Sequence, residues 1–285
     1  MKTKNLTKKL VEGSVMIAFA TVLSICEIVK MPYGGSVTLA SMLPILIIAY
    51  RHGVGFGLAS AGVFALIQQL LGISNLSPVS TWQSVVAVIV LDYALAFTVI
   101  ALGALLKDRL GLDNAKLFKK QEIELGAGMA LACILRYICH TVAGATVWAG
   151  LSIPDEAAMI YSLGYNATYM IPETIVSVLA AVWIGGVMDF SRAVPTRLKR
   201  ENTSESRVSV VCRILHPVSR LFALSTVAVC SLLVFAHVQV PDSGVFTFAL
   251  MHEVNWVAFF IVLSVGALLS LGCFIAAKLL ERRAK

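Results

Sequence analysis

Stretches of apolar residues long enough to cross a lipid bilayer recur along the whole chain. A spanning helix needs about 20 mostly apolar residues, because the hydrocarbon core is about 30 Å thick. Hydrophobic residues make up 58% of the chain and charged residues 14%, against roughly one quarter charged in soluble domains. No segment alternates with the period of a membrane barrel strand. The sequence therefore predicts an all-α, polytopic transmembrane helical bundle. The expected spans are Gly13–Val29, Ser36–Tyr50, Gly53–Leu71, Val85–Leu106, Ile123–Trp148, Ala167–Phe190, Val218–Val238 and Trp256–Leu280. Because Ser36–Tyr50 is short, we expect it to be either tilted or partly sheltered by its neighbours.

The distribution of Lys and Arg predicts the orientation of the bundle. If the N-terminus is cytoplasmic, all of the 23 Lys and Arg residues except Lys30 and Arg136 fall in segments that face the cytoplasm. The positive-inside rule predicts such an asymmetry. We therefore expect a multi-pass protein of the plasma membrane with both termini in the cytoplasm. The net charge of +7 then reflects topology and attraction to anionic lipid, and we expect no nucleic-acid partner.

A polar, basic stretch divides the chain. Ser191–Arg213 includes the run RAVPTRLKRENTSES and is typical of a flexible linker. We expect a six-helix membrane domain over residues 1–190, a cytoplasmic linker over 191–213 and a two-helix extension over 214–285. Polar residues at membrane depth lie almost entirely in the first part, so we expect the site there.

Polar and aromatic residues interrupt the apolar sequence between Arg136 and Glu173. A polar group without water in hydrocarbon costs several kcal/mol, so such residues indicate a function. At the rise of an α-helix, His140 lies about 12 Å below the outer helix end near Trp148. Asp92, with Tyr93 beside it, lies about 10 Å below the outer surface by the same rise. We therefore expect a pocket in the outer half of the bundle, open to the outside of the cell.

The last residues of this stretch are expected at the outer side as well. Tyr161 and Asn166 fall in the predicted loop between the fifth and sixth helices, and Glu173 in the first turns of the sixth. Loop positions often carry polar side chains, so Tyr161 and Asn166 are weak signals when taken alone. For Pro172-Glu173 we favour a structural interpretation, a helix kink with a surface carboxylate.

Structural interpretations compete with the binding ones. Asp92 either contacts a ligand or pairs with Arg136, since buried charges are usually paired. His140, one helical turn from Arg136, is either a site residue or a core histidine with satisfied hydrogen bonds. Trp148 either stacks on a ligand or belongs to the aromatic belt at the membrane interface.

Taken together, these residues favour a small, planar, nitrogen-rich and cationic ligand. A carboxylate in a low dielectric attracts a cation, and aromatic faces add cation–π attraction. The sequence has no GxxxxGK[ST], HExxH or GxSxG motif, and its histidines lack metal-ligand spacing. We expect no enzyme activity, catalytic residue, cofactor or metal, so transport energy must come from an ion gradient or a partner. Ser14 and Ala18, one turn apart, indicate either a partner interface or ordinary packing.

Four sequence blocks occur in an order and spacing typical of a known family. They are YGGSVTLASMLPI (33–45), LDYALAF (91–97), RYICH with a tryptophan eight residues beyond its histidine, and YSLGYNATYMIPE (161–173). Along residues 1–190 the chain resembles the thiamine-binding S-components (ThiT type) of energy-coupling factor vitamin importers. The resemblance implies a six-helix binding subunit without its own ATPase. Its partners would be a coupling transmembrane subunit and two cytoplasmic ATPase subunits.

The resemblance also implies roles for individual residues. Asp92 would engage thiamine, His140 and Trp148 would pack against its rings, and Tyr161 and Asn166 would hydrogen-bond around its aminopyrimidine. Ser14 and Ala18 resemble the motif that docks on the coupling subunit. The implied substrate-binding residues are Asp92, Tyr93, His140, Trp148, Tyr161 and Asn166.

Two positions depart from the family pattern. Gly35 stands where some members have a tryptophan, so either one aromatic wall is missing or Tyr33 supplies it. Another aromatic residue of the family, in the third helix, appears in this chain as Phe64. The two-helix extension lies outside the resemblance. The sequence thus predicts the substrate-binding membrane subunit of an ATP-driven thiamine importer. The alternative is a stand-alone secondary carrier for another cationic heteroaromatic compound.

Overall fold

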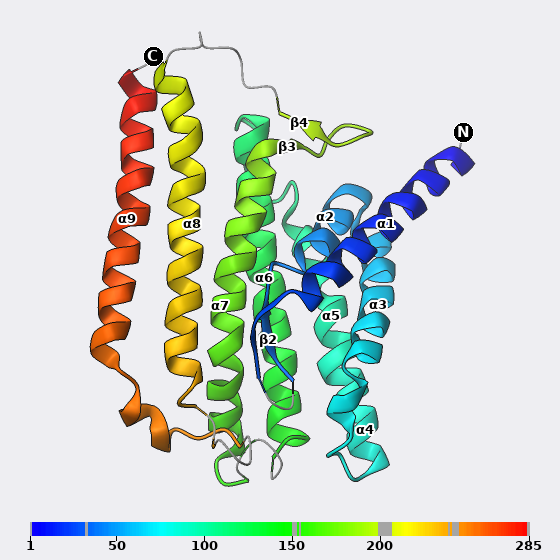
Figure 1. The fold of residues 1–285 in the computed structure, drawn as a ribbon. Coiled ribbons are helices and arrows are strands. Elements are labelled where there is room, and N and C mark those ends of the chain that lie inside the picture. Colours follow the sequence, from blue (N-terminus) through cyan, green and yellow to red (C-terminus); the bar gives the residue numbers. More distant parts are fainter. Residues whose placement is uncertain are drawn as a thin grey trace. The chain divides into compact units, whose positions relative to one another are not determined.

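A computed structural model describes residues 2–31, 34–149, 153, 155–198, 207–238, 240 and 245–283. Helices dominate this part of the chain (Figure 1), which confirms the predicted polytopic helical bundle. The helices are α1 (Lys2–Ile25), α2 (Leu43–His52), α3 (Val54–Leu71), η1 (Ile73–Leu76), α4 (Trp82–Val88), η2 (Ile89–Leu95), α5 (Ala96–Thr98), η3 (Val99–Leu106), α6 (Leu117–Thr146), α7 (Ala158–Val187), α8 (Arg207–Phe235), η4 (Ala249–Glu253) and α9 (Trp256–Arg283). The short strands are β1 (Glu27–Lys30), β2 (Ser36–Thr38), β3 (Met188–Asp189) and β4 (Thr196–Arg197).

The chain divides into two compact units. The first comprises Met1–Leu198 together with Gln239–Phe248, and the second comprises Lys199–Val238 together with Ala249–Lys285. The predicted six-helix region, residues 1–190, falls within the first unit. Gln239–Phe248 also belongs to the first unit, although in sequence it lies between α8 and α9.

Six helices among the described residues are long and apolar enough to cross a membrane. They are Val54–Leu71, Trp82–Leu106, Leu117–Thr146, Ala158–Val187, Ile214–Phe235 and Trp256–Leu280. The first predicted span, Gly13–Val29, instead combines the end of α1 with β1, and α1 carries Lys8, Lys9 and Glu12 in its first half. This helix is therefore not among the six.

The predicted span Ser36–Tyr50 is wrong. Residues 36–38 form β2, which pairs antiparallel with β1, and only Leu43–His52 are helical. Ten residues rise about 15 Å, half of the hydrocarbon thickness. Every residue from Leu43 to Tyr50 is buried inside the protein, so this run is apolar because it lies in the core.

The first unit is packed tightly around glycines. A Cβ atom on Gly103 of η3 would lie 2.3 Å from the backbone oxygen of Gly128 in α6, so the two backbones touch. Small residues commonly allow such close helix contacts in membrane proteins. The contact fixes the span Trp82–Leu106 against α6, the two segments that carry Asp92 and His140.

Replacement of Gly103 should therefore destabilise the protein. We expect Gly103→Val to cost about 1–3 kcal/mol, because the added methyl groups force the two backbones apart. The matched control is Gly62→Val in α3, since a Cβ atom at Gly62 meets nothing within 4 Å. The unfolding temperature of each variant in detergent measures the effect, and equal temperatures for the two variants would contradict the packing argument.

Candidate functional site

The first unit contains a cavity of about 320 Å³, lined by residues of α1, α3, η1, η2, α5, α6, α7 and the β1–β2 region. Small-molecule sites typically enclose about 300–1,000 Å³, so the cavity has room for one small ligand. The predicted site residues in its wall are Asp92, Tyr93, His140, Trp148 and Asn166.

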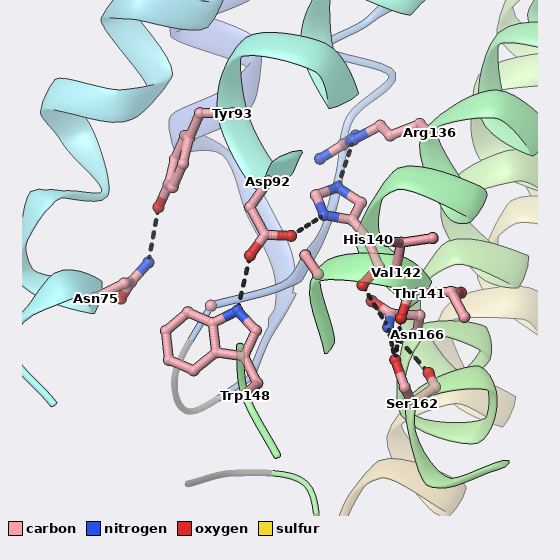
Figure 2. Close-up of polar contacts among 12 residues, drawn as sticks. Asn75, Asp92, Tyr93, Arg136, His140, Thr141, Val142, Trp148, Ser162 and Asn166 are labelled. Atoms are coloured by element: carbon pink, nitrogen blue, oxygen red, sulfur yellow. Dashed lines mark hydrogen bonds and ion pairs between the residues drawn. The ribbon is translucent and has the colours of Figure 1, made fainter. Parts of the chain in front are cut away.

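Asp92 forms the centre of the polar contacts in this wall. It lies in the π-helical segment η2, and such segments often mark functional sites. Figure 2 shows its carboxylate between two rings: Oδ1 lies 2.9 Å from His140 Nδ1, and Oδ2 accepts a hydrogen bond of 2.7 Å from Trp148 Nε1. The Asp92 side chain is 14% exposed, and Trp148 is 8% exposed. Both carboxylate oxygens are thus held by neighbouring rings at the cavity wall.

The hydrogen bonds of His140 define its protonation. Arg136 Nε donates to His140 Nε2 over 3.1 Å, and a guanidinium has no acceptor atom. Nε2 must therefore be the unprotonated nitrogen, so the proton is on Nδ1, which faces Asp92. This pattern corresponds to a neutral imidazole that accepts from Arg136 and donates to Asp92.

Arg136 contacts Asp92 through His140 rather than directly. Its guanidinium carbon lies 4.4 Å from the centre of the Phe97 ring, and Nη1 lies 3.3 Å from the sulfur of Met42. Within the described residues the side chain at salt-bridge distance from Asp92 is His140, which its hydrogen bonds define as neutral. The two sequence interpretations of Asp92 are therefore linked, because Arg136 orients the imidazole that holds the carboxylate.

Tyr93 points toward Asn75, away from the side chains that hold Asp92, as Figure 2 shows. Its hydroxyl lies 3.3 Å from Asn75 Nδ2 and donates to the backbone oxygen of Gly72 over 3.3 Å. Its ring stacks on Phe97 at 6.3 Å. Phe64 is fully buried and meets the Phe97 ring edge-on at 5.5 Å. Phe64 therefore does not line the cavity itself but packs against Phe97, which does.

The predicted loop position of Tyr161 and Asn166 is wrong. Helix α7 begins at Ala158, nine residues before the predicted start at Ala167, so both residues are helical. As a result one face of α7 presents a row of buried side chains at helical spacing. The row consists of Ser162, Tyr165, Asn166, Tyr169 and Glu173.

Tyr165 and Tyr169 are cavity residues that sequence reasoning missed. Tyr169 lies four residues after Tyr165 and three after Asn166, and this helical spacing was the available signal, but it needed the correct helix start. Asn166 bonds within this face: its Nδ2 donates to the His140 backbone oxygen over 3.2 Å, and its Oδ1 accepts from the Tyr169 hydroxyl over 2.6 Å. Tyr161 is not among the residues that line the cavity; its ring lies 5.0 Å from that of Phe248.

Comparison with known proteins identifies the group to which these residues belong. A family profile described as "Thiamine transporter protein (Thia_YuaJ)" matches residues 10–188. The chain is 32% identical over 171 residues to the thiamine transporter ThiT of Bacillus subtilis (strain 168), which covers 59% of this chain and 85% of that protein. The chain belongs to the thiamine transporter family. No solved structure matched it.

The family match covers the cavity but not α8 and α9. It also includes Ser14 and Ala18 of the predicted partner interface. Both residues are exposed on α1, whereas Gly13 and Ala20 are buried. The predicted interface therefore lies on a free face of the helix, among the described residues.

Gly35 stands at the position where the sequence comparison expects a tryptophan in some family members. The backbone there has a φ of +82°, and a Cβ atom would lie 2.9 Å from Tyr169 Cε1. The Tyr169 ring thus occupies the space that a side chain at Gly35 would enter. It meets His140 edge-on at 6.1 Å, so it supplies an aromatic wall from α7. Tyr33, the predicted substitute, lies outside the described residues.

Glu173 is buried and is not the surface carboxylate that we predicted. Its Oε2 accepts from the backbone nitrogen of Thr38 over 2.5 Å, and its Oε1 accepts from the Thr38 hydroxyl over 2.8 Å. Thr38 Oγ1 also lies 2.9 Å from Ser41 Oγ. The carboxylate therefore ties β2 and the turn between β2 and α2 to α7, in keeping with the structural role expected for it.

Glu173 variants should test this anchoring role. Glu173→Leu leaves the buried Thr38 N–H without an acceptor and should cost about 1–3 kcal/mol of stability. Glu173→Gln keeps an acceptor oxygen of the same shape and should cost less. In detergent the unfolding temperature should fall in the order wild type, Glu173→Gln, Glu173→Leu. A leucine variant as stable as wild type would rule out the anchoring role.

Among the described residues there is no group of three or more His, Cys, Asp or Glu side chains placed to hold a metal ion. The polar side chains at the cavity are instead carboxylates, cations, one imidazole, amides, hydroxyls and phenols. The charged ones are Asp92, Glu27, Lys30 and Arg136, and Glu27 pairs with Lys30 over 3.5 Å. Such groups can hold and orient a small polar organic ligand.

Proposed function

We propose that this chain is the thiamine-binding membrane subunit of an ATP-driven importer of the energy-coupling factor type. It captures thiamine from outside the cell in the cavity beside Asp92. Membership of the thiamine transporter family supports transport of this vitamin, and the relative in Bacillus subtilis carries the name thiamine transporter ThiT.

The observation that carries the proposal is the way in which Asp92 is held. Its two oxygens meet an imidazole and an indole N–H, and the imidazole is neutral by its hydrogen-bond pattern. Neutral donors fix a carboxylate without cancelling its charge. In the low dielectric of the bundle that charge attracts a cation strongly. The thiazolium ring of thiamine is such a cation.

The other walls suit the rings of the vitamin. Aromatic side chains attract a desolvated cation by about 2 kcal/mol and stack on flat heterocycles. The Asp92 carboxylate fixes the plane of the Trp148 indole, so this ring is ready to stack before the ligand arrives. Asn75 and Gln68 supply amides at the cavity for the edge of an aminopyrimidine. The aromatic residues at the cavity are Tyr93, Phe97, Trp148, Tyr165 and Tyr169.

The helices that bear the cavity support its opening to the outside. On α6, Lys120 and the cavity residue His140 are separated by about 30 Å of helical rise. Helix α3 follows Arg51, and its last residue, Leu71, lines the cavity. Helix α1 likewise has its lysines in its first half and Ser24 at the cavity. If the basic ends face the cytoplasm, as the positive-inside rule requires, the cavity faces outward.

Binding to the purified wild-type protein is the first test. We expect thiamine to bind in detergent without sodium and to quench tryptophan fluorescence as it stacks on Trp148. A Kd in the nanomolar range corresponds to about −12 kcal/mol, which a buried site with several contacts supplies. The absence of binding at micromolar thiamine would exclude the proposal.

Neutralisation of Asp92 tests the residue on which the proposed function depends. Asp92→Asn should weaken thiamine binding at least about tenfold, because the hydrogen-bonded charge is lost. The matched control is Asp108→Asn, a carboxylate outside the cavity. The hydrogen bond from Lys120 lowers the pKa of Asp108, so the control also removes an ionised group. If Asp92→Asn lowers only the unfolding temperature and leaves affinity unchanged, Asp92 is purely structural.

Reconstitution separates the subunit from a stand-alone carrier. In proteoliposomes the chain alone should take up no thiamine under a sodium or proton gradient. Uptake should require the coupling subunit, both ATPase subunits and ATP inside the vesicles, in the orientation that places the ATPases there. Gradient-driven uptake by the chain alone would instead favour the secondary carrier. Ser14→Leu and Ala18→Leu should reduce ATP-driven uptake while leaving thiamine binding unchanged.

A further inference from the structure

A short segment between α8 and α9 packs on the helix that forms one wall of the cavity. Residues 245–248 belong to the first unit, and Phe246 is only 1% exposed. The Phe246 ring meets Tyr165 edge-on at 5.7 Å, and the Phe248 ring lies 5.0 Å from Tyr161. The two phenylalanine rings meet each other at 5.0 Å. These four residues form one aromatic cluster, made from α7 and from a segment beyond the family match.

Gly164 makes room for this cluster. A Cβ atom at this position would lie 2.5 Å from Phe248 Cζ and 3.3 Å from Phe246 Cε1. Any other residue would push the phenylalanines away from α7. The sequence of α7 therefore accommodates the segment at the turn that carries Tyr161 and Tyr165.

Tyr165 joins the aromatic cluster to the cavity. It lines the cavity and is 8% exposed. Its hydroxyl donates to the backbone oxygen of Gly34 over 2.8 Å, and its ring meets Tyr169 edge-on at 6.0 Å. Gly34 itself lines the cavity and lies just before β2, with a φ of +103°. One side chain thus contacts both Phe246 of the segment 245–248 and Gly34 at the cavity.

We infer that Phe246 and Phe248 are positioning residues for the cavity. They hold Tyr165 in the orientation that bonds to Gly34, and this bond keeps the β1–β2 connection against the bound ligand. The segment between α8 and α9 therefore slows dissociation of the substrate. The identity of the substrate, thiamine, rests on the proposed function; the contact between Phe246 and Tyr165 does not.

The physical reason is the confinement of one ring. Tyr165 is held between the edges of Tyr169 and Phe246, and its hydroxyl has Gly34 as its acceptor. Truncation of Phe246 leaves a void beside the ring, which gains freedom to turn away from Gly34. Edge-to-face aromatic contacts contribute enough energy that their loss changes a rate about three- to tenfold.

The primary experiment measures thiamine dissociation from the full-length protein. Phe246→Ala should accelerate dissociation about three- to tenfold and change the association rate less. The matched control is Phe260→Ala on α9, a 58% exposed ring whose aromatic partners among the described residues are Trp256 and Phe259. It should leave both rates as in wild type. Equal dissociation rates for Phe246→Ala and wild type would overturn the inference, even if the unfolding temperature fell.

A double variant tests whether Phe246 acts through Tyr165. In a Tyr165→Ala background, addition of Phe246→Ala should accelerate dissociation no further, because the positioned ring is already absent. Full additivity of the two changes would contradict a positioning role. Because Phe246 is buried, Phe248→Ala provides a second measurement in the same direction, at a position that is 41% exposed. A rate unchanged in this variant as well would remove the role of the segment.

Hydrogen exchange on the ligand-free protein decides the inference independently of thiamine. Phe246→Ala should speed amide exchange across β1 and β2 relative to wild type, whereas Phe260→Ala should not. If wild type binds no thiamine, the proposed function fails, and exchange alone decides the positioning role. If wild type binds thiamine but the variants change neither exchange nor dissociation, only the positioning role fails.

Discussion

A carboxylate enclosed in an apolar helical bundle is the constraint on which the first unit depends. Asp92 is mostly buried within a segment of membrane-spanning length, so each of its oxygens requires a donor from the protein. Both donors come from one stretch of chain: His140 near the end of α6, and Trp148 just beyond it. Two hydrogen bonds therefore fix the level at which η2 meets α6. Arg136, one turn earlier, selects the tautomer that makes the first of them possible.

A second buried carboxylate shows how the environment separates binding from support. Glu173 is fully buried and accepts hydrogen bonds from the backbone N–H and the hydroxyl of Thr38, so both of its oxygens are occupied within the protein. It does not line the cavity, whereas Asp92 does. Asp92 is bonded to two rings that themselves line the cavity, so a ligand there meets both the charge and the rings. The two acids lie in the same bundle, yet only one of them is placed to act on a ligand.

Hydropathy predicted much of this fold, and the errors have physical causes. The long spans were recognisable because lipid and protein core both favour apolar side chains. For the same reason Ser36–Tyr50 was predicted to span, although its helical part is a short buried element. The start of α7 was missed because Tyr161 and Asn166 are polar, and polar residues near a predicted helix end indicate a loop. With that start misplaced, the helical spacing that puts Tyr165 and Tyr169 in the cavity could not be recognised.

The hydrogen-bond partners of the site residues could not be predicted from the sequence, because they come from segments that are distant along the chain. That His140 and Asp92 lie at one depth followed from counting helical rise, but the Trp148 N–H reaches Asp92 only because the chain turns after α6. Tyr161 makes the same point more strongly. By position in the family it would contact the ligand, yet in this chain its ring packs on Phe248, a residue outside the matched region. The role of a matched residue therefore depends on what the rest of its own chain packs against it. When a segment outside the family match packs on a binding helix, the role of a residue on that helix can be assigned only after the contacts of that segment are known.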